Sequence, residues 1–219
     1  MNRFLRGAAL AALTLAASSA LATTASAQSY GRLVVLGDSL SDNGNLFLAS
    51  GGTQPPSPPY FRGRFSNGPV FTEQLGFLAA NFNGPVNGSI NLSYGGSRQQ
   101  LTTYVSRGGT FGANDLVSIL GGANNIFQKI GAFAVLPPAS QGNPTGFVDP
   151  AIRGAVADMN FLVGDIASRG AGTILVTNLP RLGTTPQFSP TPLAGLADYA
   201  GSQFNSQLQT ALLALAPTR

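Results

Sequence analysis

Short apolar runs alternate along the chain with longer segments in which apolar residues recur every three or four positions. Residues 33–36, 116–120 and 173–177 are nearly continuous aliphatic runs, the pattern of strands that are buried on both faces of a sheet. Residues 89–94 have a strand-like pattern and end at a Gly-Gly pair. Because segments of helical periodicity separate these runs, the sequence predicts an α/β domain with a parallel sheet flanked by helices.

Three segments carry helix signals. Residues 69–80 follow an Asn-Gly pair, which places Pro69 at the first helical position. A second helix is expected to begin with Asp149 as N-cap and to end at Gly170. Its apolar residues recur at helical spacing: Ile152, Val156, Met159, Val163 and Ile166. A last amphipathic helix is expected over residues 193–215.

The first 27 residues have the pattern of a signal peptide. Arg3 and Arg6 form a basic start, residues 7–17 an apolar core, and residues 25–27 (ASA) a small-x-small cleavage site. The apolar core is short for a membrane span, which needs about 20 residues. We therefore expect a secreted or periplasmic protein, with residues 28–219 forming one domain. The alternative is a buried N-terminal helix.

Charge and composition exclude several classes of function. The formal charge of +4 comes from 12 basic and 8 acidic residues, and two of the basic residues lie in the predicted signal peptide. The others are scattered, so no nucleic-acid-binding surface is expected. Because the chain has no Cys and no His, neither disulfides nor a zinc or copper site is expected. We expect no metal and no cofactor.

Small polar segments follow each predicted strand, at residues 37–45, 95–97, 122–125 and 178–183. Ligands of open parallel sheets bind beyond the carboxyl ends of the strands, so these segments predict an active site. Ser39 comes directly after the first strand in a Gly-Asp-Ser turn. On spacing alone it is either a nucleophile or the capping residue of a helix.

Two of these segments supply further hydrogen-bond donors. Gly96 offers a backbone N–H that a substrate can approach closely, because no side chain intervenes. Asn124 offers a side-chain amide, and with the N–H of Ser39 these donors would form an oxyanion hole, each worth about 10²–10³ in rate. Asn114 lies in a similar motif but precedes the third strand, so we expect it at the opposite edge of the sheet.

Residues 37–45 (GDSLSDNGN) resemble the first sequence block of the GDSL, or SGNH, hydrolases. Residues 91–96 are similar to the second block, and residues 122–125 to the third, where Asn125 replaces the usual Asp. Residues 62–69 and 178–186 are similar to the secreted bacterial lipase/esterase branch. The resemblance covers most of residues 31–215 and implies a flavodoxin-like three-layer α/β/α sandwich. It also implies hydrolysis of a small-molecule ester or lipid through an acyl-enzyme on Ser39, with Gly96 and Asn124 binding the oxyanion.

The absence of histidine conflicts with this chemistry. A serine esterase needs a general base, imidazole is the usual one, and Asp38 and Asp42 beside Ser39 would be poor bases as ordinary carboxylates. The last family block, Asp-x-x-His, and the strand before it have no counterpart before Arg219. We therefore expect a truncated chain that lacks the final strand and the catalytic histidine. The alternatives are a non-catalytic secreted binding protein, or the passenger domain of an autotransporter whose outer-membrane barrel would follow Arg219.

Overall fold

The computed structural model describes residues 29–77, 88–94 and 96–215, so the predicted signal peptide lies outside the described residues. All strand pairs are parallel, and the sheet has the order β2-β1-β3-β4. Its strands are β1 (Arg32–Gly37), β2 (Ile90–Asn91), β3 (Asp115–Leu120) and β4 (Thr173–Val176). The prediction of a parallel α/β sheet is confirmed, and strands β1, β3 and β4 lie where the apolar runs predicted them.

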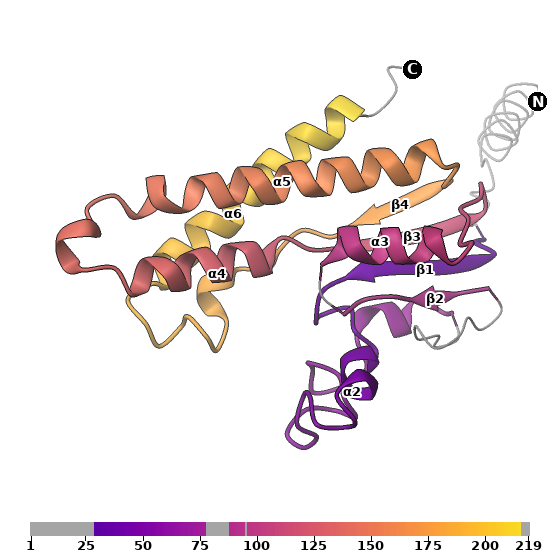
Figure 1. The fold of residues 1–219 in the computed structure, drawn as a ribbon, viewed down its shortest axis with the longest axis horizontal. Coiled ribbons are helices and arrows are strands. Elements are labelled where there is room, and N and C mark those ends of the chain that lie inside the picture. Colours follow the sequence, from indigo (N-terminus) through magenta and orange to yellow (C-terminus); the bar gives the residue numbers. More distant parts are fainter. Residues whose placement is uncertain (1–28, 78–87, 95, 216–219) are drawn as a thin grey trace, which may run out of the picture.

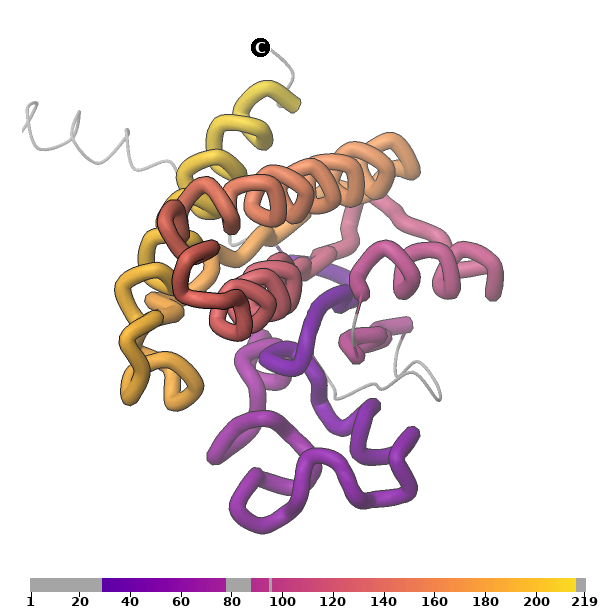
Figure 2. The backbone as a smooth tube through the Cα atoms, turned by 60° about the vertical axis from the view of Figure 1, so that its left-hand side comes forward, coloured from indigo at the N-terminus to yellow at the C-terminus, as the bar shows by residue number. Residues whose placement is uncertain are grey.

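Helices pack against this sheet and against one another. The α-helices are α2 (Asn45–Ala49), α3 (Ser97–Ser106), α4 (Ala123–Ala134), α5 (Pro144–Ser168) and α6 (Ala194–Leu215). Short 3-10 helices are η1 (Phe71–Gln74), η2 (Pro138–Ser140) and η3 (Leu182–Thr184). Figure 1 shows α3 in front of the strands and α5 above them, while α4 extends to the left beyond the ends of the strands. Helix α6 crosses α5 and packs against it (Figures 1 and 2). No helix in the described part of the chain combines the length and the apolar character that crossing a membrane requires.

The central strand β1 buries side chains on both of its faces. Val34 and Leu36 belong to the main core, together with residues of α3, α4, α5 and α6. Leu33 and Val35 point to the other face and form a smaller cluster with Leu116. This burial on two faces explains the continuous apolar run of β1, and the arrangement is consistent with a three-layer α/β/α sandwich.

The prediction of a helix over residues 69–80 is wrong. Only the single turn of η1 forms, and Gly76 follows it with a φ of +83°, a left-handed conformation that ends a right-handed helix. The Glu73 side chain accepts a hydrogen bond from the N–H of Val70 at 2.9 Å, which fixes the start of this turn. Residues 78–80 of the prediction lie outside the described residues.

The predicted start of the long helix α5 is also wrong. Asn143, not Asp149, is the N-cap: its Oδ1 accepts the N–H of Gly146 at 2.9 Å, and Pro144 occupies the first turn. Pro150 lies inside the helix. The expected apolar face does form, since its residues are buried except for the half-buried Val163, and Gly170 follows the helix with a φ of +97°.

Strands β2 and β4 differ from their predictions in length and burial. β2 has only two residues, although the N–H groups of Leu92 and Tyr94 continue its hydrogen bonding to β1. β4 was predicted to be buried on both faces, but its residues are half-buried and the side chain of Leu175 is 38% exposed. The reason is that β4 forms an edge of the described sheet and pairs there with β3 alone.

Candidate active site

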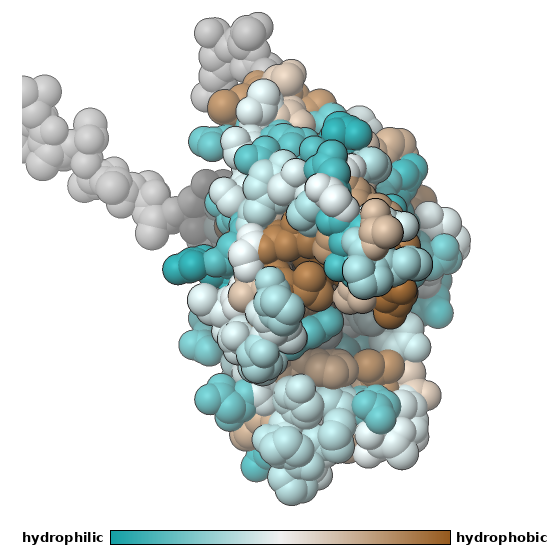
Figure 3. Space-filling model, turned by 90° about the vertical axis from the view of Figure 1, so that its left-hand side faces the viewer, coloured by the Kyte–Doolittle hydropathy of each residue, from teal (hydrophilic) through white to brown (hydrophobic). Residues whose placement is uncertain are grey.

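The predicted site residues follow the carboxyl ends of three neighbouring strands. β1 leads to Ser39, β2 to Gly96 and β3 to Asn124. The ends of these strands are tied together: the N–H of Asp38 donates to the carbonyl of Leu120 at 3.1 Å. Figure 3 views the molecule from this side and shows hydrophobic surface recessed between hydrophilic residues. The edge of the sheet that sequence reasoning selected therefore does gather the three segments.

The turn after β1 leaves Ser39 and Leu40 accessible to solvent, and the residues on either side of this pair are buried. The Oδ1 of Asp38 accepts the N–H of Leu40 at 3.0 Å, and the N–H of Ser41 donates to the carbonyl of Asp38 at 3.1 Å. Asp38 and Ser41 are buried, whereas Ser39 is partly exposed. Helix α2 has Gly44 as its N-cap, so Ser39 is not the capping residue of a helix. Hydrogen bonds to Asp38 therefore fix the turn, and the Ser39 side chain stays accessible.

Asp42 holds the start of α2 and is not placed to act as a base. Its carboxylate accepts three backbone N–H groups, from Gly44 at 2.8 Å, Asn45 at 2.5 Å and Leu46 at 3.0 Å. Burial raises the pKa of Asp42, while these hydrogen bonds and the charge of Arg64 act in the opposite direction. Both oxygens are therefore engaged with the backbone around the start of α2, the helix that follows the turn at residues 38–41.

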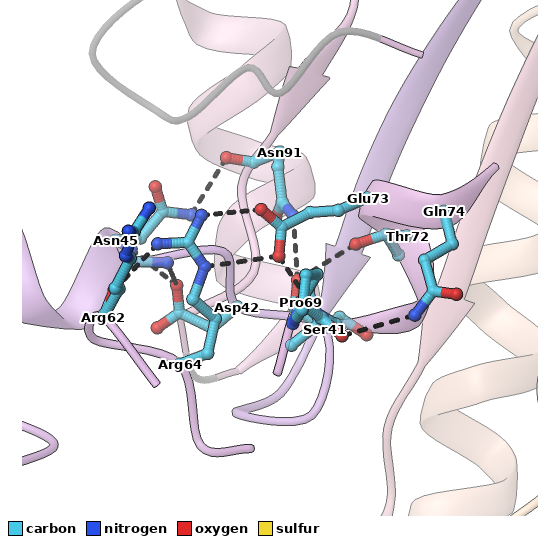
Figure 4. Close-up of polar contacts among 12 residues, drawn as sticks. Ser41, Asp42, Asn45, Arg62, Arg64, Pro69, Thr72, Glu73, Gln74 and Asn91 are labelled. Atoms are coloured by element: carbon cyan, nitrogen blue, oxygen red, sulfur yellow. Dashed lines mark hydrogen bonds and ion pairs between the residues drawn. The ribbon is translucent and has the colours of Figure 1, made fainter. Parts of the chain in front are cut away.

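Buried amide side chains connect the turn at residues 38–41 and the start of α2 to β2 and the residues that follow it. The Nδ2 of Asn45 donates to the carbonyls of Asn91 at 2.9 Å and Ser93 at 2.8 Å. The Nδ2 of Asn91 donates to the carbonyl of Ser41 at 2.8 Å, as Figure 4 shows. These bonds join residues that are about 50 positions apart in sequence, so they fix the turn against the strand that leads to Gly96.

Gln100 makes a second connection, which sequence reasoning missed. Its side-chain oxygen accepts the N–H of Gly37 and its side-chain nitrogen donates to the carbonyl of Gly37, both at 2.7 Å. Gln100 is buried in the first turn of α3, and its own N–H donates to the carbonyl of Gly96 at 3.2 Å. The segments of Ser39 and Gly96 are therefore held together through one side chain. A glutamine at this position carries no sequence signal, because its partner is backbone.

The two expected oxyanion donors lie at helix starts. Gly96 is the exposed N-cap of α3, and a Cβ added there would meet nothing within 4 Å. Asn124 is exposed in the first turn of α4, whose N-cap Gly122 has a φ of +103°. A Cβ on Gly122 would lie 2.6 Å from the ring of Phe204 in α6, so this close contact fixes where α4 begins. The catalytic roles of Gly96 and Asn124 stay predictions.

Asn114 lies at the opposite edge of the sheet, as its position before β3 predicts. Its carbonyl accepts the N–H of Gly31 at 2.8 Å, and Gly31 comes directly before β1. The motif at residues 112–115 thus belongs to the amino ends of the strands. There, the carboxylate of Asp115 pairs with Arg32 through two contacts of 2.7 Å.

An ion pair anchors the long loop at residues 50–69 beside the turn at residues 38–41. The guanidinium of Arg64 contacts both oxygens of Glu73, at 2.6 and 3.2 Å. From the same 3-10 turn, the hydroxyl of Thr72 donates to the carbonyl of Ser41 at 3.5 Å (Figure 4). The loop therefore has a fixed attachment next to the site.

Comparison with known proteins identifies this arrangement. A family model of GDSL-like lipases and acylhydrolases matches residues 33–218. This chain belongs to that family. It is 31% identical over 204 residues to the phosphatidylcholine-sterol acyltransferase of Aeromonas hydrophila, a match that covers 86% of this chain and 56% of that protein. A segment of 44 residues, which is 20% of this chain and 10% of the relative, is 52% identical to the thermolabile hemolysin of Vibrio parahaemolyticus.

The chain spans little more than half the length of the first of these relatives. Membership of the GDSL family supports an ester-acting hydrolase or acyltransferase, and the family resemblance stated from the sequence is confirmed. Serine esterases usually use a histidine as the general base, and none of these 219 residues is histidine. Burial raises the pKa of the Asp38 carboxyl, but one of its oxygens already accepts the N–H of Leu40.

Proposed function

We propose that this domain transfers acyl groups from carboxylic esters through an acyl-enzyme on Ser39, and that it acts outside the cytoplasm. The observation that carries the proposal is the turn after β1. It leaves Ser39 partly exposed beside the exposed Leu40, with Asp38 and Ser41 buried on either side of this pair, at the edge where β2 and β3 also end. The predicted signal peptide supports export to the periplasm or the medium.

In this mechanism the Oγ of Ser39 attacks the carbonyl carbon of the ester while a base removes its proton. Negative charge then develops on the carbonyl oxygen. The backbone N–H groups of Ser39 and Gly96 and the side-chain amide of Asn124 stabilise it. When this intermediate collapses, the protonated base gives its proton to the leaving oxygen, the alcohol departs and the acyl group stays on Ser39.

The second half of the reaction decides between a hydrolase and an acyltransferase. Water as acceptor releases a carboxylic acid, whereas an alcohol as acceptor forms a new ester. The similarity to a phosphatidylcholine-sterol acyltransferase supports lipid esters as donors and leaves both acceptors open. We therefore place the reaction in the class of lipid acyl transfer, with hydrolysis as the transfer to water.

The base of this reaction is not a histidine of the 219 residues. Imidazole in solution should then replace it in part, because a small base can enter an exposed site and remove the Ser39 proton. We expect a fluorophosphonate probe to label the protein slowly, and the labelling rate to rise with the concentration of imidazole. Mass spectrometry of the labelled peptide identifies the residue.

Two serine variants make this test specific. Ser39→Ala should abolish labelling. Ser41→Ala is a matched control, because the Ser41 hydroxyl is buried and has no hydrogen-bond partner in the described structure. Equal labelling of the Ser39→Ala variant and the unmodified chain would refute the proposed nucleophile.

The absence of histidine favours a second candidate, a secreted protein that binds esters or lipids without converting them. This candidate predicts that imidazole leaves the labelling rate of Ser39 unchanged while ligands still bind. The imidazole titration therefore separates the two functions.

A further inference from the structure

A groove begins at Gly96 and runs along helix α3. Its volume is about 460 Å³, and it lies between α3, the end of α2 and the residues that follow β2. Eight described residues line it: Ala49, Leu92, Tyr94, Gly96, Gln99, Gln100, Thr103 and Arg107. Four of the lining residues, Gly96, Gln100, Thr103 and Arg107, recur every three or four positions and so belong to one face of the helix, with Gln99 at its margin.

The groove has the length and the lining of a site for an extended apolar chain. The 11 steps from Gly96 to Arg107 correspond to about 16 Å along a helix axis. Leu92 forms a buried part of the wall, and the ring of Tyr94 is 52% exposed beside it. No acidic side chain is among the described lining residues. A neutral hydrocarbon chain can therefore lie in the groove without burying an unpaired carboxylate.

One end of the groove lies at a residue that is expected to take part in the proposed acyl transfer. Gly96 is both the expected oxyanion donor and a lining residue at one end, while Arg107 marks the other end. An ester whose carbonyl oxygen is bound at Gly96 can extend its acyl chain along α3 toward Arg107. The exposed guanidinium there favours water over a methyl group, so it limits the chain length that the groove covers.

We infer that this groove binds the acyl chain of the ester substrate, with Thr103 at its middle determining how long a chain fits. The inference rests on the proposed function, because the proposed acyl-enzyme gives the chain its direction. Binding of the chain itself needs no catalysis and can be measured separately.

The first experiment measures reversible binding of 1-hexanol, 1-octanol and 1-decanol to the full chain by titration calorimetry. Each additional buried methylene contributes about 0.8 kcal/mol, which corresponds to roughly fourfold in affinity. We expect the affinity to rise by about 15-fold from hexanol to octanol. Primary alcohols are suitable probes because, unlike fatty acids, they carry no charge that could bind Arg107 instead.

Two tryptophan variants on the same helix test the location. Thr103→Trp fills the groove and should lower the affinity for decanol at least tenfold. Thr102→Trp is the matched control, since Thr102 is exposed and does not line the groove. If Thr103→Trp fails to fold, as judged by circular dichroism, Ala49→Trp blocks the groove from the opposite wall. Equal loss of binding in the variants at positions 103 and 102 would overturn the assignment.

A second experiment connects the groove to Ser39. With imidazole present, alkyl phosphonates of increasing chain length should label the unmodified chain faster, and this dependence should vanish in Thr103→Trp. If decanol binds in the groove but Ser39 is never labelled, the groove stands and the proposed function fails. If Ser39 is labelled equally by short and long phosphonates, the acyl-chain assignment is wrong although the nucleophile is right.

Discussion

Gln100 should control both the stability of the domain and the reactivity of Ser39. Gly37 ends β1 where β2 is too short to pair with it fully, and Gln100 takes the place of a strand partner. In a Gln100→Leu variant the N–H of Gly37 loses the bond that Gln100 makes, which costs about 1–3 kcal/mol for a buried donor. The Gly37 carbonyl keeps the N–H of Tyr94 at 3.3 Å, so its loss is smaller, about 0.5–1.5 kcal/mol.

The expected total is about 2–4 kcal/mol, which for a domain of this size lowers the Tm by roughly 4–16 °C. Differential scanning calorimetry measures this shift, and the control is Gln99→Leu, an exposed neighbour on the same helix. Labelling of Ser39 in imidazole should also slow in Gln100→Leu, because its turn begins one residue after Gly37. If the two leucine variants melt at the same temperature, Gln100 does not hold the end of β1.

A Gln100→Glu variant gives this reasoning a pH signature. The neutral carboxyl group can accept from the N–H of Gly37 and donate to its carbonyl, as glutamine does, whereas the carboxylate can only accept. The folded state should therefore bind the proton more tightly than the unfolded state. The free energy of unfolding should fall as pH rises through the raised pKa of Glu at this position. Urea unfolding at several pH values measures this slope, and the unmodified chain provides the reference.

Other variants test the remaining contacts. Gly122→Ala should be destabilised by at least about 1 kcal/mol in urea unfolding, because it strains a left-handed backbone and drives a methyl into Phe204. Asn124→Ala should slow imidazole-assisted labelling by about 10²–10³, and Asn114→Ala should leave the rate unchanged. Burial raises the pKa of Asp38 above 3.8, so its ionisation costs stability as pH rises. Asp38→Asn should therefore show a flatter dependence of unfolding free energy on pH above the ordinary carboxyl value of 3.8.

The fold was predictable where burial alone determines the pattern. β1 and β3 are buried on both faces, so their runs are almost wholly apolar, with only the small Ser118 interrupting β3, and their positions follow from composition. β4 was located for the same reason, but its half-exposed edge position was not visible, because an apolar run does not reveal how many neighbours it has.

The sequence signals for a helix start gave the wrong residue where two such signals lie close together. Asn143-Pro144 and Asp149-Pro150 both match the pattern of an N-cap followed by proline, six residues apart. The structure uses the first pair, and Asp149 instead accepts the hydroxyl of Tyr199 in α6 at 3.0 Å. Which of the two pairs starts the helix depends on a contact between α5 and α6. The sequence around residue 149 does not contain that contact, because Tyr199 lies 50 residues away.

The candidate site was predictable in its exposed residues and not in its buried ones. Ser39, Gly96 and Asn124 follow strands, so the topology alone brings them to one edge. Gln100 and Asn45 hold that edge by bonding to backbone atoms 46–63 residues away. Every residue has backbone N–H or carbonyl groups, so the sequence does not show which of these groups a buried side-chain amide will bind.

The buried hydrogen bonds that hold this edge of the sheet also affect the expected choice between hydrolysis and acyl transfer. The turn at residues 38–41 and the end of β1 before it are fixed by buried bonds to β2 and α3, so the acceptor has little influence on the geometry of this turn. If the acyl chain occupies the groove on the β2 side of Ser39, an acceptor must approach from the β3 side, where Asn124 and α4 lie. The preference for water or an alcohol would then be set by the residues around Asn124, and substitutions there should change the product ratio without changing the chain-length dependence of labelling.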